Sequence, residues 1–232
     1  MVAAGIDNGP MRVYPLASGT PAVRVVEPPQ ANIAQDAIQA ARARILATPG
    51  AFDGPKLLTL AAGPDEIAVY ETTYSVRLAH RNLAVDGVSP LGLGSLACSA
   101  AVFSPSAELL LARRSQHVSV SPGLWALPVS GGVDPGEHPD EAVRREAREE
   151  LGLPDDVELR GVALCVGAEP VGCTLLYAAT VPKADVVTAP SAEAEEHRWV
   201  SGRTLPSPAV AHLADLVAAA RAGMRMHAGP AI

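Results

Sequence analysis

One stretch of the chain decides the fold: residues 131–153 have the sequence GGVDPGEHPDEAVRREAREELGL. Its first part is rich in glycine and proline, which disfavour regular structure, so we expect a tight loop there. Pro139 suits the first turn of a helix, and Asp140 and Glu141 complement the positive end of the helix dipole. Gly152 should end the helix, because glycine adopts the left-handed backbone of a C-cap at little cost. The segment therefore predicts a loop followed by a helix.

Three acids of this helix, Glu146, Glu149 and Glu150, stand at positions i, i+3 and i+4 and therefore share one face. Like charges at this spacing cost roughly a few tenths of a kcal/mol, so something should offset them. Hard oxygen ligands in a row suit Mg²⁺ or Mn²⁺. The alternative is a solvated helix face on which the arginines of the same segment supply the counter-charges.

The whole stretch resembles the Nudix box, G-x5-E-x7-R-E-U-x-E-E-x-G-U, in which U is aliphatic. The fixed positions are occupied by Gly131, Glu137, Arg145, Glu146, Glu149, Glu150, Gly152 and Leu153. Ala147 is smaller than the aliphatic residue usual in the family, which should affect packing more than chemistry. The approach to Gly131 has one residue more than the usual P-G-G, which leaves open whether the carbonyl of Ser130 or of Gly131 reaches a metal.

This resemblance implies a Nudix hydrolase, an enzyme that cleaves a diphosphate linkage with Mg²⁺, or alternatively Mn²⁺, as its cofactor. It makes Glu146 and Glu150 direct metal ligands, and Glu149 a further ligand or the base that activates water, so all three are expected to be catalytic. The backbone carbonyl of Gly131 is a further expected ligand. A bound divalent cation would lower the pKa of water and polarise phosphorus.

Two further groups of residues are expected to support the site. Glu137 and Arg145 should form an ion pair that braces the loop against the helix, since metal ligands need to be oriented. Nudix enzymes also commonly use an acid outside the box. Candidates lie just before an expected strand, and we select Glu195 as the metal ligand from the set Glu193, Glu195 and Glu196.

The chain before the box narrows the substrate. Residues 35–137 resemble the animal Nudix proteins that hydrolyse UDP-glucose and UDP-galactose, through the short segments at 50–57, 72–74, 89–94, 110–118 and 122–124. This resemblance implies cleavage of a UDP-sugar to UMP and a sugar 1-phosphate. ADP-ribose, noncanonical nucleotides and prenyl diphosphates are the alternative substrates. A catalytically silent module that binds a nucleotide for regulation is the alternative from another class of function.

The resemblance also implies an α/β fold, a Nudix α/β/α sandwich with a mixed β-sheet and an N-terminal α+β extension. We expect residues 1–91 to form the extension and residues 92–232 the hydrolase domain. The apolar pattern predicts a helix at 32–48 and a final helix at 209–222 that Gly223 stops. The β-branched residues near 23–26 either wrap the surface or add an edge strand. Strands are expected at 57–60, 66–76, 96–103, 108–113, 162–166, 174–180 and 197–200.

Composition limits the partners. The net charge of -7 argues against binding to nucleic acid, and no apolar stretch is long enough for a membrane helix, so we expect a cytoplasmic protein with a small-molecule diphosphate substrate. A homodimer stays open. Arg113 and Arg114 end an expected strand and either contact a phosphate or nucleotide or are merely solvated. The three cysteines should be buried hydrophobic residues of a protein from a reducing compartment.

Overall fold

The structure is a computed structural model of the 232-residue chain, and it describes residues 11–17, 19–29, 34–47, 52–81, 92–118, 120–167, 172–202 and 204–227. Its strands are β1 (Arg12–Pro15), β2 (Ala22–Val25), β3 (Pro55–Ala62), β4 (Glu66–Thr73), β5 (Gly94–Phe103), β6 (Leu109–Arg114), β7 (Trp125–Ala126), β8 (Val129–Gly132), β9 (Arg160–Val166), β10 (Cys173–Thr180) and β11 (Ala194–Val200). Its helices are α1 (Gln35–Leu46), α2 (Tyr74–Arg81), α3 (Pro139–Leu151), a 3₁₀ turn η1 (Lys183–Asp185) and α4 (Leu213–His227).

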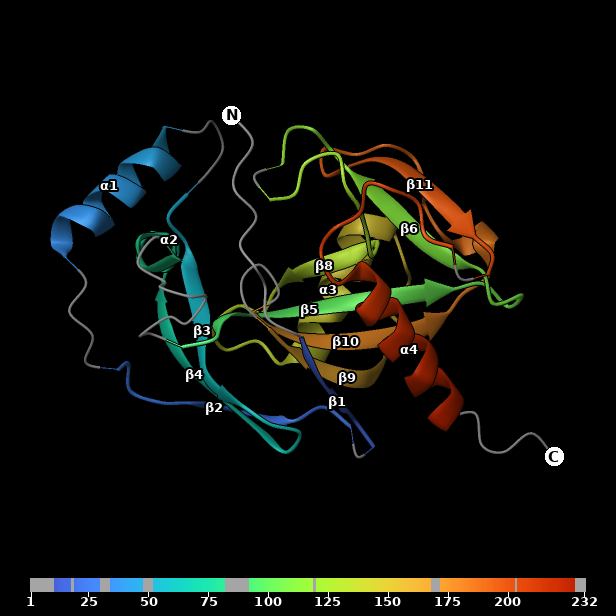
Figure 1. The fold of residues 1–232 in the computed structure, drawn as a ribbon, viewed down its shortest axis with the longest axis horizontal. Helices are drawn as coiled ribbons and strands as arrows, with labels where there is room; N and C mark the ends of the chain where they lie inside the picture. Colours follow the sequence, from blue (N-terminus) through green and yellow to red (C-terminus); the bar gives the residue numbers. More distant parts are fainter. Residues whose placement is uncertain are drawn as a thin grey trace.

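The strands form one mixed sheet that runs through both halves of the chain (Figure 1). Its main path is β1-β9-β10-β5-β3-β4-β2, with β10 parallel to β5 and antiparallel to β9. Strand β8 pairs with β5, and β6 pairs with β11. The predicted strands at 96–103, 108–113, 162–166 and 174–180 are confirmed. The domain boundary after residue 91 stays a prediction, and residues 82–91 lie outside the described part of the chain.

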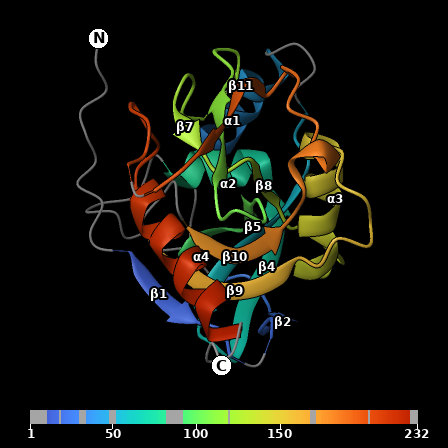
Figure 2. The same ribbon diagram turned by 90° about the vertical axis from the view of Figure 1, so that its right-hand side faces the viewer.

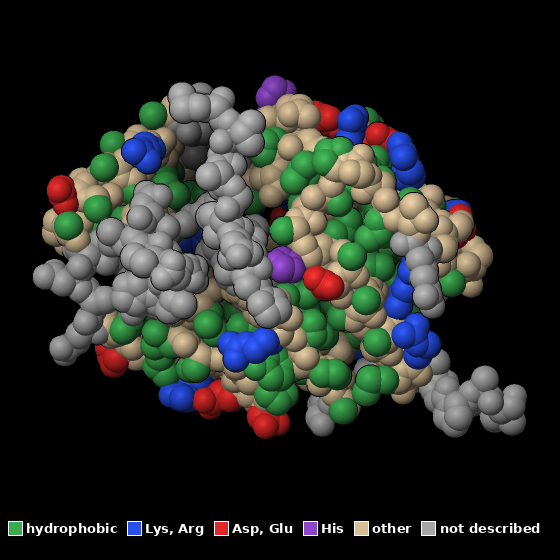
Figure 3. Space-filling model, viewed as in Figure 1, with side chains coloured by type: hydrophobic (Ala, Val, Ile, Leu, Met, Phe, Trp, Pro, Cys, Tyr) green, Lys and Arg blue, Asp and Glu red, His purple; other side chains and the backbone are tan. Residues whose placement is uncertain are grey.

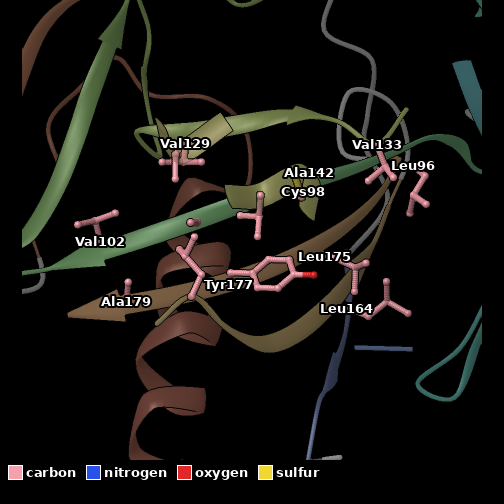
Figure 4. Close-up of a cluster of buried hydrophobic side chains, with 14 of the residues drawn as sticks. Leu96, Cys98, Val102, Val129, Val133, Ala142, Leu164, Leu175, Tyr177 and Ala179 are labelled. Atoms are coloured by element: carbon pink, nitrogen blue, oxygen red, sulfur yellow. The ribbon is translucent and has the colours of Figure 1, made fainter. Parts of the chain in front are cut away.

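Helices α3 and α4 cover opposite faces of this sheet, which confirms the predicted sandwich (Figure 2). Alternate residues of a strand point to opposite faces. In β5, Cys98 and Val102 therefore belong to one core cluster with α3, whereas Ala101 and Phe103 belong to a second cluster with α4. Figure 4 shows the first cluster, in which Tyr177 of β10 lies among aliphatic side chains of the sheet.

Before residue 92, the structure contains the predicted helix as α1 and the predicted edge strand as β2, but one expected strand is too long. The strand predicted at 66–76 ends at Thr73, and helix α2 follows directly. The carboxylate of Asp53 causes this change, because it accepts hydrogen bonds from the backbone N–H and the hydroxyl of Ser75, both at 2.7 Å. A helix start needs acceptors for its unpaired N–H groups. Here the acceptor comes from 22 residues earlier in the chain.

Two C-terminal elements also differ from the expectation. The final helix begins at Leu213 and continues through Gly223 to His227. Gly223 is therefore not a stop signal but a point of close contact, since a Cβ there would lie 2.4 Å from the Cβ of Val162 on β9. Strand β11 begins at Ala194 rather than at residue 197, so the acids expected in a loop before the strand partly belong to it.

The three cysteines are buried and free, as predicted, and burial raises the pKa of each thiol to about 12. On the face shown in Figure 3, acidic and basic side chains are interspersed rather than gathered by sign. Among the described residues, no helix has the length and apolar character needed to cross a membrane.

A hydrogen-bond network ties the N-terminal segment to the first turn of α3. The hydroxyls of Tyr177 and Thr20 both donate to Oδ1 of Asp140 at 2.6 Å. Tyr177 is almost fully buried, so its hydroxyl depends on this partner. We expect Tyr177→Phe to lower the free energy of unfolding by about 1 kcal/mol, the usual net value of such a bond. Urea denaturation measures the change, and Thr20→Val, which removes the half-exposed donor of the same network, should have a smaller effect than Tyr177→Phe. An unchanged midpoint for Tyr177→Phe would contradict the network's contribution.

Candidate active site

Helix α3 has the predicted boundaries, because its signals are local. The loop expected from Gly131 onward begins only after Gly132, because both glycines extend strand β8 in its pairing with β5. His138 is the N-cap of α3 and accepts a hydrogen bond from the backbone N–H of Asp140. Glu141 accepts one in return from the backbone N–H of His138, which completes a capping box. Gly152 ends the helix in the left-handed conformation, with a φ of 63°. The acids of α3 are therefore held on a helix that is capped at both ends.

The predicted ion pair between Glu137 and Arg145 is present. Arg145 donates from Nε to Oε1 of Glu137 at 2.9 Å and from Nη2 to Oε2 at 3.1 Å. Its Nη2 also donates to the carbonyl oxygen of Gly132 at 3.1 Å. Burial acts to raise the pKa of Glu137, but the hydrogen bonds and charge of Arg145 outweigh it and lower the pKa. The ion pair between Glu137 and Arg145 thus links the loop to helix α3 beside Glu146.

Glu146 and Glu150 both contact strand β8. A Cβ at Gly131 would lie 2.0 Å from Oε1 of Glu146, so this carboxylate fills the space that a side chain would need. One residue earlier, the backbone N–H of Ser130 donates to Oε2 of Glu150 at 2.9 Å. The structure therefore brings the two expected metal ligands together on the segment whose carbonyl groups were expected to join them.

The electrostatics of these two acids are unfavourable as they stand. Burial raises the pKa of Glu150 to about 8, and the charges of Glu146 and Glu193 add to this, against the hydrogen bond from Ser130. Burial also raises the pKa of Glu146, although Arg145 donates to it at 2.5 Å and opposes the shift. Partly buried carboxylates that repel one another in this way are stabilised either by a proton or by a positive charge such as a divalent cation.

Glu149 differs from the other two acids. Its side chain is 59% exposed, and its Oε2 lies 3.7 Å from Nη1 of Arg145. It is on the helix face predicted from the sequence, but it lies at the outer edge of the acid cluster. Among the described residues, no three His, Cys, Asp or Glu side chains are close enough together to hold a metal by themselves. Ligation would thus combine the partly buried carboxylates of Glu146 and Glu150 with other oxygen donors.

The three candidate acids outside the loop and helix, Glu193, Glu195 and Glu196, have different surroundings in the structure. Glu195, which we selected from the sequence, accepts a hydrogen bond from the backbone N–H of Gln116 at 2.9 Å and lies 3.5 Å from Nη2 of Arg113. Glu196 lies 3.5 Å from Nε of Arg113. Glu193 instead lines a cavity of about 20 Å³ with Glu150. A cavity of this size holds about one water molecule. The structure thus places Glu193 opposite Glu150, and Glu195 beside Arg113.

The two arginines at the end of β6 also have different surroundings. Arg113 is paired with the acids of β11, whereas Arg114 lines the small cavity with Glu150 and Glu193. Arg114 also lines a second cavity of about 260 Å³, and its Nε donates to the carbonyl oxygen of Val120 at 2.9 Å. Arg114 therefore stands between the acid cluster and a larger cavity.

Sequence reasoning did not identify the polar floor of the larger cavity. It is lined by hydroxyl residues of three neighbouring strands, Ser99 of β5, Ser130 of β8 and Thr174 of β10. The hydroxyl of Ser99 donates to that of Ser130 at 3.0 Å. The available signal was a hydroxyl residue inside otherwise aliphatic strands, because buried polar side chains are uncommon there. The walls are mainly apolar and include Leu127 and Leu216.

The residues present fit a divalent cation. Glu146 and Glu150 offer hard oxygen donors with raised pKa values, and Glu150 lines a small cavity together with Glu193. Magnesium takes oxygen ligands and usually keeps several waters, so it does not need a cage made only of side chains.

Comparison with known proteins agrees with this chemistry. A family model described as NUDIX domain matches residues 95–220, more than half of the chain. The nucleoside triphosphatase NudI of Klebsiella pneumoniae is 58% identical over 43 residues, which are 18% of this chain and 29% of that protein. The matched stretch thus spans less than a third of the length of this curated relative.

Solved structures show a weaker overall likeness. DR0079 from Deinococcus radiodurans has a TM-score of 0.46 at 23% identity, over 63% of this chain and 83% of that one. The MutT NUDIX hydrolase from Burkholderia pseudomallei has a TM-score of 0.42 at 26% identity, over 53% of this chain and 95% of that one.

Proposed function

The chain belongs to the Nudix family, and from this premise we propose that it is a divalent-metal-dependent diphosphohydrolase of nucleoside diphosphate derivatives. One observation carries the proposal: Glu146 and Glu150 lie together on the Ser130–Gly131 segment of β8, partly buried and with raised pKa values. A helix face that only meets solvent would not bury these acids against a glycine. The alternative of a solvated acidic face is therefore disfavoured.

Each residue of the site has a separate role in this proposal. Glu146 and Glu150 would hold Mg²⁺ or Mn²⁺, and Glu193 is better placed than Glu195 to be the acid from outside the box. The carbonyl of Ser130 is a better candidate ligand than that of Gly131, because Gly131 pairs with Cys98 of β5 and its carbonyl oxygen lies 3.7 Å from Sγ of Cys98. A bound cation would neutralise the diphosphate and lower the pKa of water. Glu149 is exposed beside these ligands and can accept the proton of the attacking water. Glu137 and Arg145 orient the ligands without touching the substrate.

The larger cavity supports a nucleoside as one half of the substrate. Its apolar walls suit a base and its hydroxyl floor offers hydrogen bonds, while Arg114 connects it to the acid cluster and can contact a phosphate. A UDP-sugar is our preferred substrate, on the resemblance of residues 35–137. The short match to a nucleoside triphosphatase favours nucleoside triphosphates as the second candidate.

A hydrolysis screen tests the function. The wild-type protein is incubated with UDP-glucose, ADP-ribose, nucleoside triphosphates and prenyl diphosphates, with Mg²⁺, Mn²⁺ or EDTA, and the products are separated by chromatography. We expect turnover with metal, none with EDTA, and UMP with glucose 1-phosphate from UDP-glucose. Turnover of another class alone would refute the UDP-sugar proposal and leave the hydrolase intact. Tight nucleotide binding without product at either metal would instead indicate a regulatory module.

A further inference from the structure

We propose that Lys56, from the N-terminal extension, is a substrate-binding residue whose ammonium group binds a phosphoryl oxygen of the diphosphate across the edge strand from Glu146. The proposal rests on the proposed hydrolase function. It assigns to the extension a direct contact with the anionic part of the substrate.

Lys56 is brought to the glycine-rich loop by the continuous sheet. It lies on β3, which pairs with β5, and β5 in turn pairs with β8. Its Nζ lies 3.4 Å from the position that a Cβ on Gly132 would occupy. The ammonium group therefore lies directly over the backbone of β8, although it comes from a segment 76 residues earlier in the chain.

Lys56 and Glu146 approach β8 from opposite faces. The side-chain directions of Gly131 and Gly132 alternate in the strand, and one is filled by Glu146 while the other meets Lys56. The neighbour of Lys56 supports this, because Leu57 packs in the core cluster of α3 and the side chain of Lys56 therefore points to the other face. This second face is the one that carries Ser130 and the larger cavity.

The strand offers no side chain between the two charged groups. Two consecutive glycines form this part of β8, and within the described residues β8 pairs only with β5. A path from Oε1 of Glu146 through the Cα atoms of Gly131 and Gly132 to Nζ of Lys56 is about 12 Å long. The two charged groups are therefore at most about 12 Å apart. An extended nucleoside diphosphate derivative is longer than this, so one molecule can reach both groups.

The ammonium group is also available for an anion. Within the described residues, the ion pair recorded for it is with Asp134, at 3.9 Å and therefore beyond hydrogen-bonding distance. The side chains of Lys56 and Asp134 are 32% and 55% exposed, and such exposed pairs contribute little. A compact ammonium with three donors suits a phosphoryl group, which would replace Asp134 as its partner.

Steady-state kinetics test this role, with the compound that the wild-type protein hydrolyses in the screen described above. The variants are Lys56→Met, Lys56→Arg and Asp134→Asn. We expect Lys56→Met to raise KM about tenfold with kcat within a factor of two, as for loss of a charge-assisted hydrogen bond. Lys56→Arg should restore most of the affinity. Asp134→Asn is the matched control, and it should leave KM unchanged or lower it, because it removes a competitor for the ammonium group. An equal rise of KM in Asp134→Asn and Lys56→Met would overturn the proposal, since Lys56 would then act only through the loop.

A binding measurement separates this proposal from the hydrolase function. Calorimetry with a methylene-bridged UDP-glucose analogue and Mg²⁺ gives Kd without turnover. A tenfold weaker Kd for Lys56→Met supports the role of Lys56 even if the wild-type protein hydrolyses nothing. Equal Kd values for the two proteins overturn it, as does the absence of any binding to the wild-type protein.

Discussion

Glu150→Gln should abolish metal-dependent hydrolysis, with a loss of about a thousandfold in kcat/KM, since removal of several kcal/mol of charge stabilisation acts tenfold per 1.36 kcal/mol. Glutamine keeps the shape of the side chain and can still accept the hydrogen bond from the backbone N–H of Ser130. The variant loses only the negative charge. The loss of activity should therefore appear in a folded protein, and Mn²⁺ titration should show weaker binding.

The same variant has an expected effect on stability without metal. Burial raises the pKa of Glu150 from 4.5 to about 8, so the folded protein binds this proton more tightly than the unfolded chain does. Stability from this group is then full below pH 4.5 and is lost as pH rises toward 8. Thermal unfolding in EDTA, measured as a function of pH, tests this effect. Glu150→Gln should lack this part of the pH dependence, and at pH 8 it should be at least as stable as the wild type.

The control for Glu150→Gln is Glu158→Gln, an exposed acid whose partner is Arg160. It should change neither hydrolysis nor Mn²⁺ affinity. If Glu150→Gln kept its turnover within tenfold of the wild type, Glu150 would not be a metal ligand, whatever its burial.

The parts of the site that could be predicted from the sequence are those with local causes. Helix α3 has its caps and prolines within a few residues of the boundaries they determine, so residues 139–152 were predicted correctly. Gly131 and Gly132 were expected in a loop but extend strand β8, because their pairing with β5 depends on a distant part of the chain. Helix α2 was not predicted, because the shorter hydrogen bonds of its first turn are made to Asp53, which is distant in the sequence, whereas the local cap at Thr73 accepts only a long bond of 3.5 Å from the backbone N–H of Val76. Gly223 was misinterpreted for a similar reason, since the strand that requires the glycine is 61 residues earlier.

The choice among the acids outside the box illustrates a second limit. Strand β11 has a register shift between Ala194 and Glu196, and a bulge of this kind changes which face the neighbouring side chains point to. Alternation from the sequence therefore cannot tell which of Glu193, Glu195 and Glu196 points toward Glu150. Lys56 was also beyond sequence reasoning, because its relation to Gly132 exists only through the pairing of three strands.

Gly131→Ala should separate folding from metal binding, because a single methyl group would take the place of a carboxylate. The new Cβ would lie 2.0 Å from Oε1 and 2.1 Å from Cδ of Glu146, so the end of this side chain must move away. Gly131 lies in extended strand β8 and is not among the glycines with a positive φ, so alanine is compatible with its backbone. The fold should persist with a similar thermal midpoint. Displacement of a ligand by about 1 Å or more should lower turnover by about a hundredfold, with a comparable loss of Mn²⁺ affinity.

Gly132→Ala is the matched control for this substitution, since it adds the same methyl group to the next residue on the opposite face. Its Cβ would meet only the flexible end of Lys56 at 3.4 Å, so the carboxylates of α3 should be undisturbed. Mn²⁺ affinity should then equal that of the wild type, and any change should be confined to KM. If both alanine variants lost metal binding equally, the strand itself would be the sensitive element. If Gly131→Ala bound Mn²⁺ as well as the wild type, Glu146 could not be a ligand in the position it occupies against Gly131, and the cation would have to be held by the remaining acids.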